Sequence, residues 1–282
     1  MTPVAPASNT SEPVPNRAVP GDQNAGIDIS AVTVVYGGPN GENVLALDGV
    51  DLRIADGEFV CLVGPSGCGK STLLKVVSDL IPPTSGQVTI GGASPSEMRK
   101  AGRLGLVFQQ ANLMPWLTVG KNIDLLRSLV VGRGGHVPGT APKASDLLDV
   151  VGLGGFGDKY PNQLSGGMQQ RASLARALAL DPAVLLMDEP FAALDEITRD
   201  RMAFELMRVW QLYRKTVLFV THSLSEAVLL ADRVVLMSPR PGRIRRVFEI
   251  DLPRPRTAET RLDERFHRLV LELNRELYAV LS

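Results

Sequence analysis

The run Gly64-Pro65-Ser66-Gly67-Cys68-Gly69-Lys70-Ser71-Thr72 constrains the fold of this 282-residue chain more than any other stretch. An apolar run, Phe59–Val63, precedes it and residues 73–77 continue it, which predicts a strand, a glycine-rich loop and a helix. The spacing G-x-x-x-x-G-K-S is that of the phosphate-binding loop, in which glycines let backbone N–H groups turn towards phosphate oxygens. The helix adds the positive end of its dipole. Lys70 can reach the β- and γ-phosphates and Ser71 can bind Mg²⁺, so this stretch alone predicts nucleotide binding.

Composition narrows the class of protein. Lys plus Arg and Asp plus Glu number 30 each, so the chain has no net charge that would favour nucleic acid as a partner. Its cysteines, Cys61 and Cys68, do not resemble a disulfide framework, which is typical of the reducing cytosol. No apolar run reaches the roughly 18 residues that span a bilayer and no secretion signal is visible, so we expect any membrane role to come through a partner.

The order of strand and helix patterns predicts an α/β fold. Residues 1–25 are rich in proline and lack apolar periodicity, which predicts a disordered tail. Short strands around tight turns, at residues 27–36, 50–54, 59–63 and 86–90, predict an antiparallel sheet beside the phosphate loop. Beyond them, strands alternate with helices and predict a mainly parallel sheet. The expected strands lie at 104–108, 183–187, 216–220, 234–237 and 244–250, and the expected helices at 118–126, 145–151, 168–180, 196–214 and 224–231.

The end of the chain, residues 253–282, predicts an amphipathic helix after a break at two prolines. Its apolar residues recur at helical spacing, and a stripe of this kind usually packs on its own domain. A contact with a regulator is the alternative. The stripe consists of Leu262, Phe266, Leu269, Val270, Leu273 and Leu277.

Polar side chains follow the predicted parallel strands at the edge where ligands bind in open α/β sheets. Asp188, after an apolar strand, is the expected carboxylate for a metal ion, and its neighbour Glu189 can take a proton from water. A helix-capping acidic pair is the alternative. Gln109 and His222 end two other strands. His222 is placed to touch a γ-phosphate, although a histidine in this setting is more often structural when considered alone.

A second anion-binding helix start is predicted at Leu164-Ser165-Gly166-Gly167-Met168-Gln169-Gln170-Arg171. With this stretch in place, residues 27–250 resemble the ATP-binding subunit of an ABC transporter, because the stretch is similar to the family signature and follows the other motifs in order. The resemblance implies a P-loop NTPase fold with a mainly parallel core sheet, an antiparallel β subdomain and an α-helical subdomain. The ATPase domain would be residues 26–252, with the helical subdomain at about 111–165.

The resemblance also implies roles for individual residues. Tyr36 would stack on adenine, and Gly64 to Thr72 would hold the phosphates of ATP. Mg²⁺ would be bound by Ser71, Gln109 and Asp188. Gln109 would also approach the attacking water and sense the permease. Glu189 would be the general base and His222 the switch histidine.

The remaining implied roles concern partners. Ser165, Gly166 and Gly167 would contact the γ-phosphate of ATP held by a second subunit, and residues 192–195 would lie at that interface. The resemblance therefore implies a head-to-tail homodimer that drives integral-membrane permease subunits and, through them, an extracytoplasmic substrate-binding protein. The protein would be peripheral, on the cytoplasmic face of the cell membrane, with no nucleic-acid partner. Coupling would come from tighter binding of ATP to the closed dimer.

Within the family, residues 110–119 and 226–244 resemble nitrate, sulfonate and taurine importer subunits, and thiamine-precursor importers share these segments. The sequence departs from the importer pattern at Ser223, where importers often carry Asp, and in the Gly/Pro-rich segment 132–142. A soluble non-transport ABC ATPase is disfavoured because the chain has neither a second cassette nor a heptad run. A non-hydrolysing regulator is disfavoured by Glu189 and His222.

Overall fold

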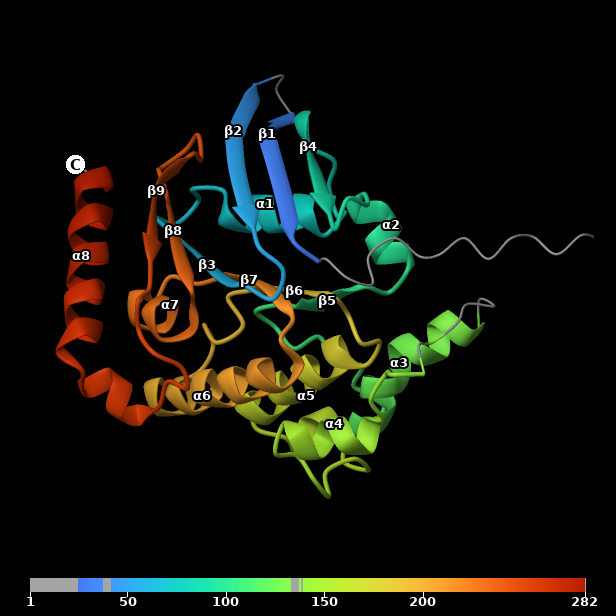
Figure 1. The fold of residues 1–282 in the computed structure, drawn as a ribbon. Helices are drawn as coiled ribbons and strands as arrows, with labels where there is room; N and C mark the ends of the chain where they lie inside the picture. Colours follow the sequence, from blue (N-terminus) through green and yellow to red (C-terminus); the bar gives the residue numbers. More distant parts are fainter. Residues whose placement is uncertain (1–24, 38–41, 133–136, 138, 282) are drawn as a thin grey trace, which may run out of the picture.

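The computed structural model describes residues 25–37, 42–132, 137 and 139–281 (Figure 1). The tail predicted at 1–25 therefore lies outside the described residues except for Ala25. That residue is buried, and its backbone N–H donates to Asp56 Oδ1 at 3.1 Å. In the described part of the chain the strands form two sheets.

The smaller sheet is antiparallel, as predicted, with strand order β2-β1-β4. The strand that was grouped with it at 59–63 lies in the larger sheet instead, where it pairs in parallel on both sides and all five of its residues are buried. It consists of β1 (Ile27–Gly37), β2 (Asn43–Ile54) and β4 (Ser85–Ile90). β2 begins seven residues before the predicted strand at 50–54. Its apolar residues 44–47 are separated from that strand by Asp48 and Gly49, so the sequence pattern did not join the two parts. This extra length matters for function, since it reaches the phosphate-binding loop.

The larger sheet has the strand order β5-β6-β7-β3-β8-β9, and every neighbouring pair in it is parallel except β8 with β9. All residues of β3 and β7 are buried, as expected for strands covered on both faces. The members are β3 (Phe59–Val63), β5 (Leu104–Val107), β6 (Val184–Asp188), β7 (Thr216–Val220), β8 (Arg233–Met237) and β9 (Ile244–Glu249).

Two hydrophobic cores lie on opposite faces of the larger sheet, because side chains alternate along each strand. On β3, Val60 and Leu62 join the core shared with the small sheet and α1, whereas Phe59 and Cys61 join the core shared with α5, α6 and α7. Figure 1 shows the same layers, with α1 between the two sheets and with α5 and α6 beyond the larger sheet. The larger sheet is therefore the central layer.

The described helices differ from the predicted ones mainly at their ends. They are α1 (Lys70–Val77), α2 (Pro95–Lys100), α3 (Val119–Gly132), α4 (Ala144–Val150), α5 (Gly166–Leu178), α6 (Glu196–Tyr213), α7 (Leu224–Leu230) and α8 (Glu264–Leu281), with 3-10 turns η1 (Pro161–Gln163) and η2 (Ala258–Leu262). The short helix α2 was not predicted, although Ser94 and Glu97 form a capping box at its start. α3 continues six residues beyond the predicted 118–126, into the glycine-rich segment.

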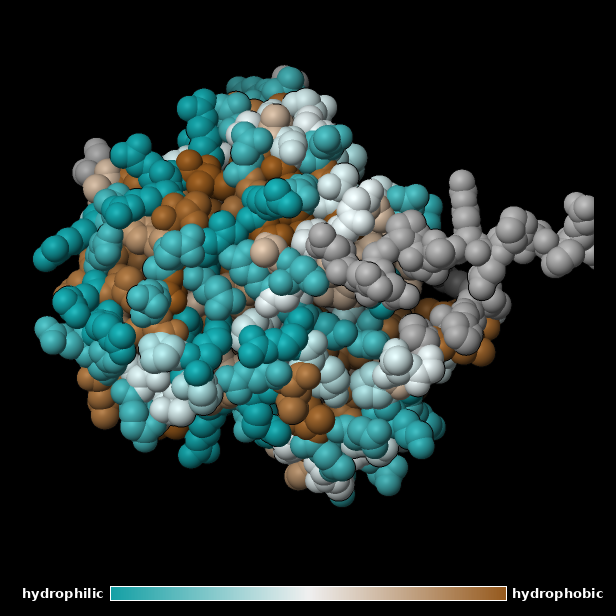
Figure 2. Space-filling view, viewed as in Figure 1, coloured by the Kyte–Doolittle hydropathy of each residue, from teal (hydrophilic) through white to brown (hydrophobic). Residues whose placement is uncertain are grey.

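The C-terminal helix α8 packs against α7 and β9. Phe266 and Leu273 are buried, and Leu269, Val270 and Leu277 pack on the same core. The prediction that Leu262 belongs to this stripe is wrong. Leu262 is the last residue of η2, before α8 begins, and it is 81% exposed. Figure 2 shows hydrophobic side chains in the seam between α8 and β9, bordered by hydrophilic ones.

Ion pairs close that seam on its outer side. Arg246 on β9 pairs with Glu272 at 2.8 Å and with Glu276 at 2.6 Å, both on α8. Across the described residues, no helix combines the length and the apolar character needed to cross a membrane.

Candidate nucleotide-binding site

Four neighbouring strands deliver the predicted site groups to one edge of the larger sheet. In the order β5-β6-β7-β3, Gln109 follows the first strand, Asp188 ends the second and Glu189 follows it, His222 follows the third and the phosphate-binding loop follows the last. The register aligns these ends, because Asp188 pairs with Val220 and Val220 with Leu62. The prediction that these groups lie beyond strand ends is confirmed.

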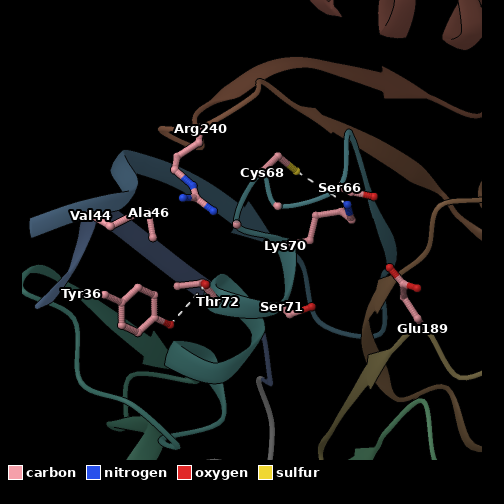
Figure 3. A pocket seen from close by; sticks show the side chains of 12 residues that line it. Tyr36, Val44, Ala46, Ser66, Cys68, Lys70, Ser71, Thr72, Glu189 and Arg240 are labelled. Atoms are coloured by element: carbon pink, nitrogen blue, oxygen red, sulfur yellow. Dashed lines mark hydrogen bonds between the residues drawn. The ribbon is translucent and has the colours of Figure 1, made fainter. Parts of the chain in front are cut away.

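The phosphate-binding loop forms the floor of a cavity of about 260 Å³ (Figure 3). Its shape depends on glycine: Gly69 has a φ of +102°, and a Cβ there would lie 2.6 Å from Leu47 Cδ2 and 3.0 Å from the Ala46 carbonyl. The start of α1 at Lys70 presents backbone N–H groups to the cavity, as an anion requires. The lining residues are Tyr36, Val44, Ala46, Ser66, Gly67, Cys68, Gly69, Lys70, Ser71, Thr72, Glu189 and Arg240.

Lys70 is buried within this loop. Its Nζ donates to the carbonyl oxygens of Gly64 at 2.8 Å and Pro65 at 3.0 Å, and it lies 3.7 Å from Cys68 Sγ. Two carbonyl dipoles therefore keep the ammonium group inside the loop, where a polyphosphate chain would meet it. The arrangement fits a compact cation that balances phosphate charge.

Ser71 and Asp188 bring a hydroxyl and a carboxylate together beside the cavity. Ser71 Oγ donates to Asp188 Oδ1 at 2.8 Å, which joins α1 to the end of β6. Burial raises the pKa of Asp188, the Ser71 hydrogen bond lowers it, and the negative charge of Glu189 raises it again; the net direction is upward. A hard cation that takes oxygen ligands fits this pair, because its charge would offset the burial of the carboxylate.

Glu189 and His222 form a second polar pair at the same edge. His222 Nδ1 lies 3.2 Å from Glu189 Oε2, and the side chains are 55% and 27% exposed, respectively. Glu189 has a φ of +45°, which is unusual for a residue with a side chain, and its N–H donates to the Val220 carbonyl at 3.0 Å. Because of this backbone conformation the two adjacent carboxylates point in different directions. That of Asp188 meets Ser71, and that of Glu189 meets His222.

Gln109 and Gly166 of the signature stretch line a different cavity, of about 380 Å³. There Gln109 shares the lining with Gly166, Gln169 and Leu194. Ser165 is the N-cap of α5 and accepts the Met168 N–H at 3.4 Å. The structure therefore joins Asp188 with Ser71 and Glu189 with His222, but it does not join Gln109 or the signature residues to the phosphate-binding loop within one chain.

Three cavity-lining residues were not predicted from the sequence: Val44, Ala46 and Arg240. The first two belong to the half of β2 that precedes the predicted strand at 50–54, and Arg240 stands in the turn between β8 and β9. Tyr36, which was predicted, has its hydroxyl 3.3 Å from Thr72 Oγ1 and is 40% exposed. It borders the opposite end of the cavity from Lys70 (Figure 3).

Comparison with known protein families identifies the family to which this chain belongs. The family model described as "ABC transporter" matches residues 47–192. The chain belongs to the ABC transporter family. This ABC protein is an ATP hydrolase whose reaction is coupled to transport, and its α/β fold is that of the ATP-binding cassette.

Similar proteins cover most of this ABC ATPase. It is 50% identical over 218 residues to an uncharacterised ABC transporter ATP-binding protein of Methanocaldococcus jannaschii, which covers 77% of this chain and 79% of that one. It is 41% identical over 229 residues to the taurine import ATP-binding protein TauB of Ruegeria pomeroyi, which covers 80% and 82% of the two chains.

Solved structures of a similar cassette agree with the fold. One is a dimeric bacterial ABC transporter cassette, with a TM-score of 0.67 and 35% identity over 80% of this chain and all of that one. Another is a dimeric post-hydrolysis state of an ATP-binding cassette bound to ADP and phosphate, with a TM-score of 0.66, 34% identity and the same coverage.

Proposed function

We propose that this ABC ATPase energises an importer for nitrate, an alkanesulfonate or taurine. The four strand ends that bring the phosphate-binding loop, Asp188, Glu189 and His222 to one edge carry the catalytic part of this proposal. Relatives named as taurine import subunits, at 41% to 43% identity, support the import part. A thiamine-precursor importer would use the same cassette and is the alternative.

ATP and Mg²⁺ fit the groups that line the site. Tyr36 would stack on adenine, residues 64–72 would hold the phosphates, and Lys70 would exchange its carbonyl partners for phosphate oxygens. Ser71 and Asp188 would hold Mg²⁺ together with Gln109, which follows β5, the neighbour of β6 in the same chain. Bound Mg²⁺ would supply neutralisation of phosphate charge.

Glu189 is the proposed general base, because its carboxylate lines the cavity beyond the phosphate-binding loop. It would accept a proton from the attacking water, and its distance of 3.2 Å from His222 Nδ1 gives it a partner that holds its orientation. His222 is the proposed switch histidine, since it is exposed enough to reach a ligand from the side of β7.

The separation of the signature residues from the phosphate-binding loop supports a head-to-tail homodimer. Ser165, Gly166 and Gly167 stand at the start of α5, and Gly166 lines the second cavity, so a second copy would bring this helix start to ATP held in the first. ATP that contacts both copies binds the closed dimer more tightly than the open one, and this difference supplies the free energy for movement.

The proposed partners are two integral-membrane permease subunits and, through them, an extracytoplasmic substrate-binding protein. The protein would then sit peripherally at the cytoplasmic face of the membrane. Uptake of radiolabelled taurine and of nitrate into vesicles that contain the complete transporter tests the substrate class. Uptake of neither compound, with uptake of a thiamine precursor, would replace this substrate class with the alternative.

The test of the catalytic assignment is Glu189→Gln in the purified protein. We expect ATP hydrolysis to fall by about a hundredfold or more, the loss typical of a removed general base, while ATP binding persists. An ATP-dependent dimer should then accumulate and be measurable by light scattering. Glu249→Gln, a matched change on the exposed outer strand β9, should leave hydrolysis unchanged. Hydrolysis at the wild-type rate by Glu189→Gln would refute the assigned base.

A further inference from the structure

The turn between β8 and β9 is fixed against the phosphate-binding loop. The Gly242 N–H donates to the Ala46 carbonyl at 2.9 Å, and the Asp48 N–H donates to the Gly242 carbonyl at 3.1 Å. A Cβ at Gly242 would collide with the Cys68 carbonyl, so glycine permits the close approach of the two backbones. The turn therefore cannot move away from the loop without breaking its bonds to β2.

The turn is also held by its own hydrogen bonds. Ser238 Oγ lies 3.2 Å from the carbonyl oxygens of Pro239 and Pro241, and it accepts the Arg243 N–H at 3.1 Å. These bonds enclose Arg240, whose backbone position is thus set relative to the cavity. The side chain starts from a rigid support, as a binding residue requires.

The Arg240 side chain descends from this turn into the cavity, between Tyr36 and Ala46 on one side and the phosphate-binding loop on the other (Figure 3). A Cβ built on Gly67 would lie 3.6 Å from Arg240 Nη2, so the guanidinium is within contact distance of the loop. The cation reaches the ligand cavity from an element outside the motifs that the sequence predicted.

Arg240 differs from other arginines of the same hairpin in its partners. Arg243 pairs with Asp48, and Arg246 pairs with Glu272 on α8. Among the described residues, the Arg240 guanidinium makes no hydrogen bond or ion pair. A cation that lines a ligand cavity without an acidic neighbour keeps its full attraction for an anionic ligand.

The cavity has an apolar end and a charged end. Tyr36, Val44 and Ala46 form the first, and Lys70 with Ser71 forms the second, while Arg240 lies between them (Figure 3). We infer that Arg240 is a further nucleotide-binding residue, whose guanidinium donates hydrogen bonds to the phosphate oxygens nearest the nucleoside. This inference rests on the proposed function, because it takes the nucleoside to lie beside Tyr36 and the terminal phosphate beside Lys70.

The planar guanidinium suits this position better than an ammonium group would. It can donate two parallel hydrogen bonds to phosphate oxygens, whereas lysine offers a single charged centre on a shorter reach. The phosphates nearest the nucleoside are common to ATP and ADP, so the contact would strengthen the binding of both. It would therefore raise affinity without favouring the hydrolytic step.

The experiment measures dissociation constants by calorimetry for ADP and inorganic tripolyphosphate, and for ATP in the Glu189→Gln background. Because Arg240 is exposed, Arg240→Ala should melt at the wild-type temperature. We expect its dissociation constants for all three ligands to rise roughly fivefold to tenfold. Arg240→Lys should recover part of this loss. Arg245→Ala, on the same hairpin but outside the cavity lining, should bind as the wild type does.

Each other result overturns the inference in a distinct way. Unchanged dissociation constants of Arg240→Ala for all three ligands would show that Arg240 does not contact the nucleotide. A loss for ATP and tripolyphosphate but not for ADP would place it on the terminal phosphate, and a loss confined to ATP and ADP would place it on the nucleoside. A wild-type protein that bound neither ATP nor ADP would instead refute the proposed function itself.

Discussion

Arg256 is expected to stabilise the end of the ATPase domain to a degree that can be worked out from its hydrogen bonds. It is only 4% exposed. Its Nη1 donates to the carbonyl oxygens of Val228 at 3.1 Å, Leu229 at 3.0 Å and Ala231 at 2.7 Å, all near the C-terminal end of α7. A helix leaves its last carbonyls without partners inside the helix, so this guanidinium serves as their cap.

The magnitude follows from what Arg256→Ala would leave behind. Three buried carbonyls would lose a charged donor at about 1 kcal/mol each, and weaker bonds to Ile250 and Leu252, at 3.3 Å, would also be lost. Burial lowers the pKa of Arg256 to about 10, so the group is still charged at neutral pH, and removing it relieves some desolvation cost. We expect a net loss of about 3 kcal/mol in the free energy of unfolding.

The assay is equilibrium unfolding in urea followed by tryptophan fluorescence. Trp210 is buried, and the neighbouring Arg254 lies 4.2 Å above its ring, so its emission reports on this region. With a slope near 3 kcal/mol per molar urea, the midpoint should fall by about 1 M. Arg256→Lys should lose less, because its ammonium group retains some donors.

Arg265→Ala is the matched control for this change. Arg265 is exposed and bonds Asp263 at the surface, so its loss should not shift the midpoint measurably. If Arg256→Ala also unfolded at the wild-type midpoint, the carbonyls would have other partners and the capping argument would be refuted.

Two further predictions concern the site and its support. Gly69→Ala should lower ATP affinity at least tenfold, because φ is +102° and its Cβ would clash with Leu47, whereas Gly49→Ala, at a φ of +58° with nothing within 4 Å, should leave calorimetric affinity unchanged. Burial raises the pKa of Glu226, which is hydrogen-bonded to Thr221 at 2.6 Å, so its stabilising contribution is present below the ordinary pKa of 4.5 and is lost as the pH rises. The melting temperature of the wild type should therefore fall relative to that of Glu226→Gln between about pH 5 and pH 8; a constant difference would contradict this sign.

The elements that were well predicted are those whose residues are uniformly buried or strongly punctuated. The boundaries of β3 matched the predicted strand, because every residue of Phe59–Val63 is apolar and is followed by glycine. The first half of β2 was missed, since Asp48 and Gly49 separate its apolar residues 44–47 from the predicted strand at 50–54. Its register is set by pairing with the preceding strand β1, and strand propensity alone does not fix such a pairing.

The site was predictable as motifs but not as an arrangement. The motifs identified both Gln109 and Asp188 as site residues. The order of predicted strands, however, does not show that Gln109 lines a separate cavity with Gly166. Arg240 and Arg256 had no local signal, because each stands among prolines and acts on residues distant in the sequence. Their roles depend on tertiary packing, which brings a turn to the phosphate-binding loop and a guanidinium to the end of α7.

The strand order has a consequence for how the protein is made. β3 carries the phosphate-binding loop, but its two neighbours are β7 and β8, which the ribosome adds much later. A nascent chain that ends before Thr216 thus contains the complete loop sequence without the strands that hold it in place. The antiparallel sheet is assembled from segments close in sequence, so it can form before the later strands are synthesised. Competence to bind nucleotide is therefore acquired near the end of synthesis, when a late strand inserts beside an early one.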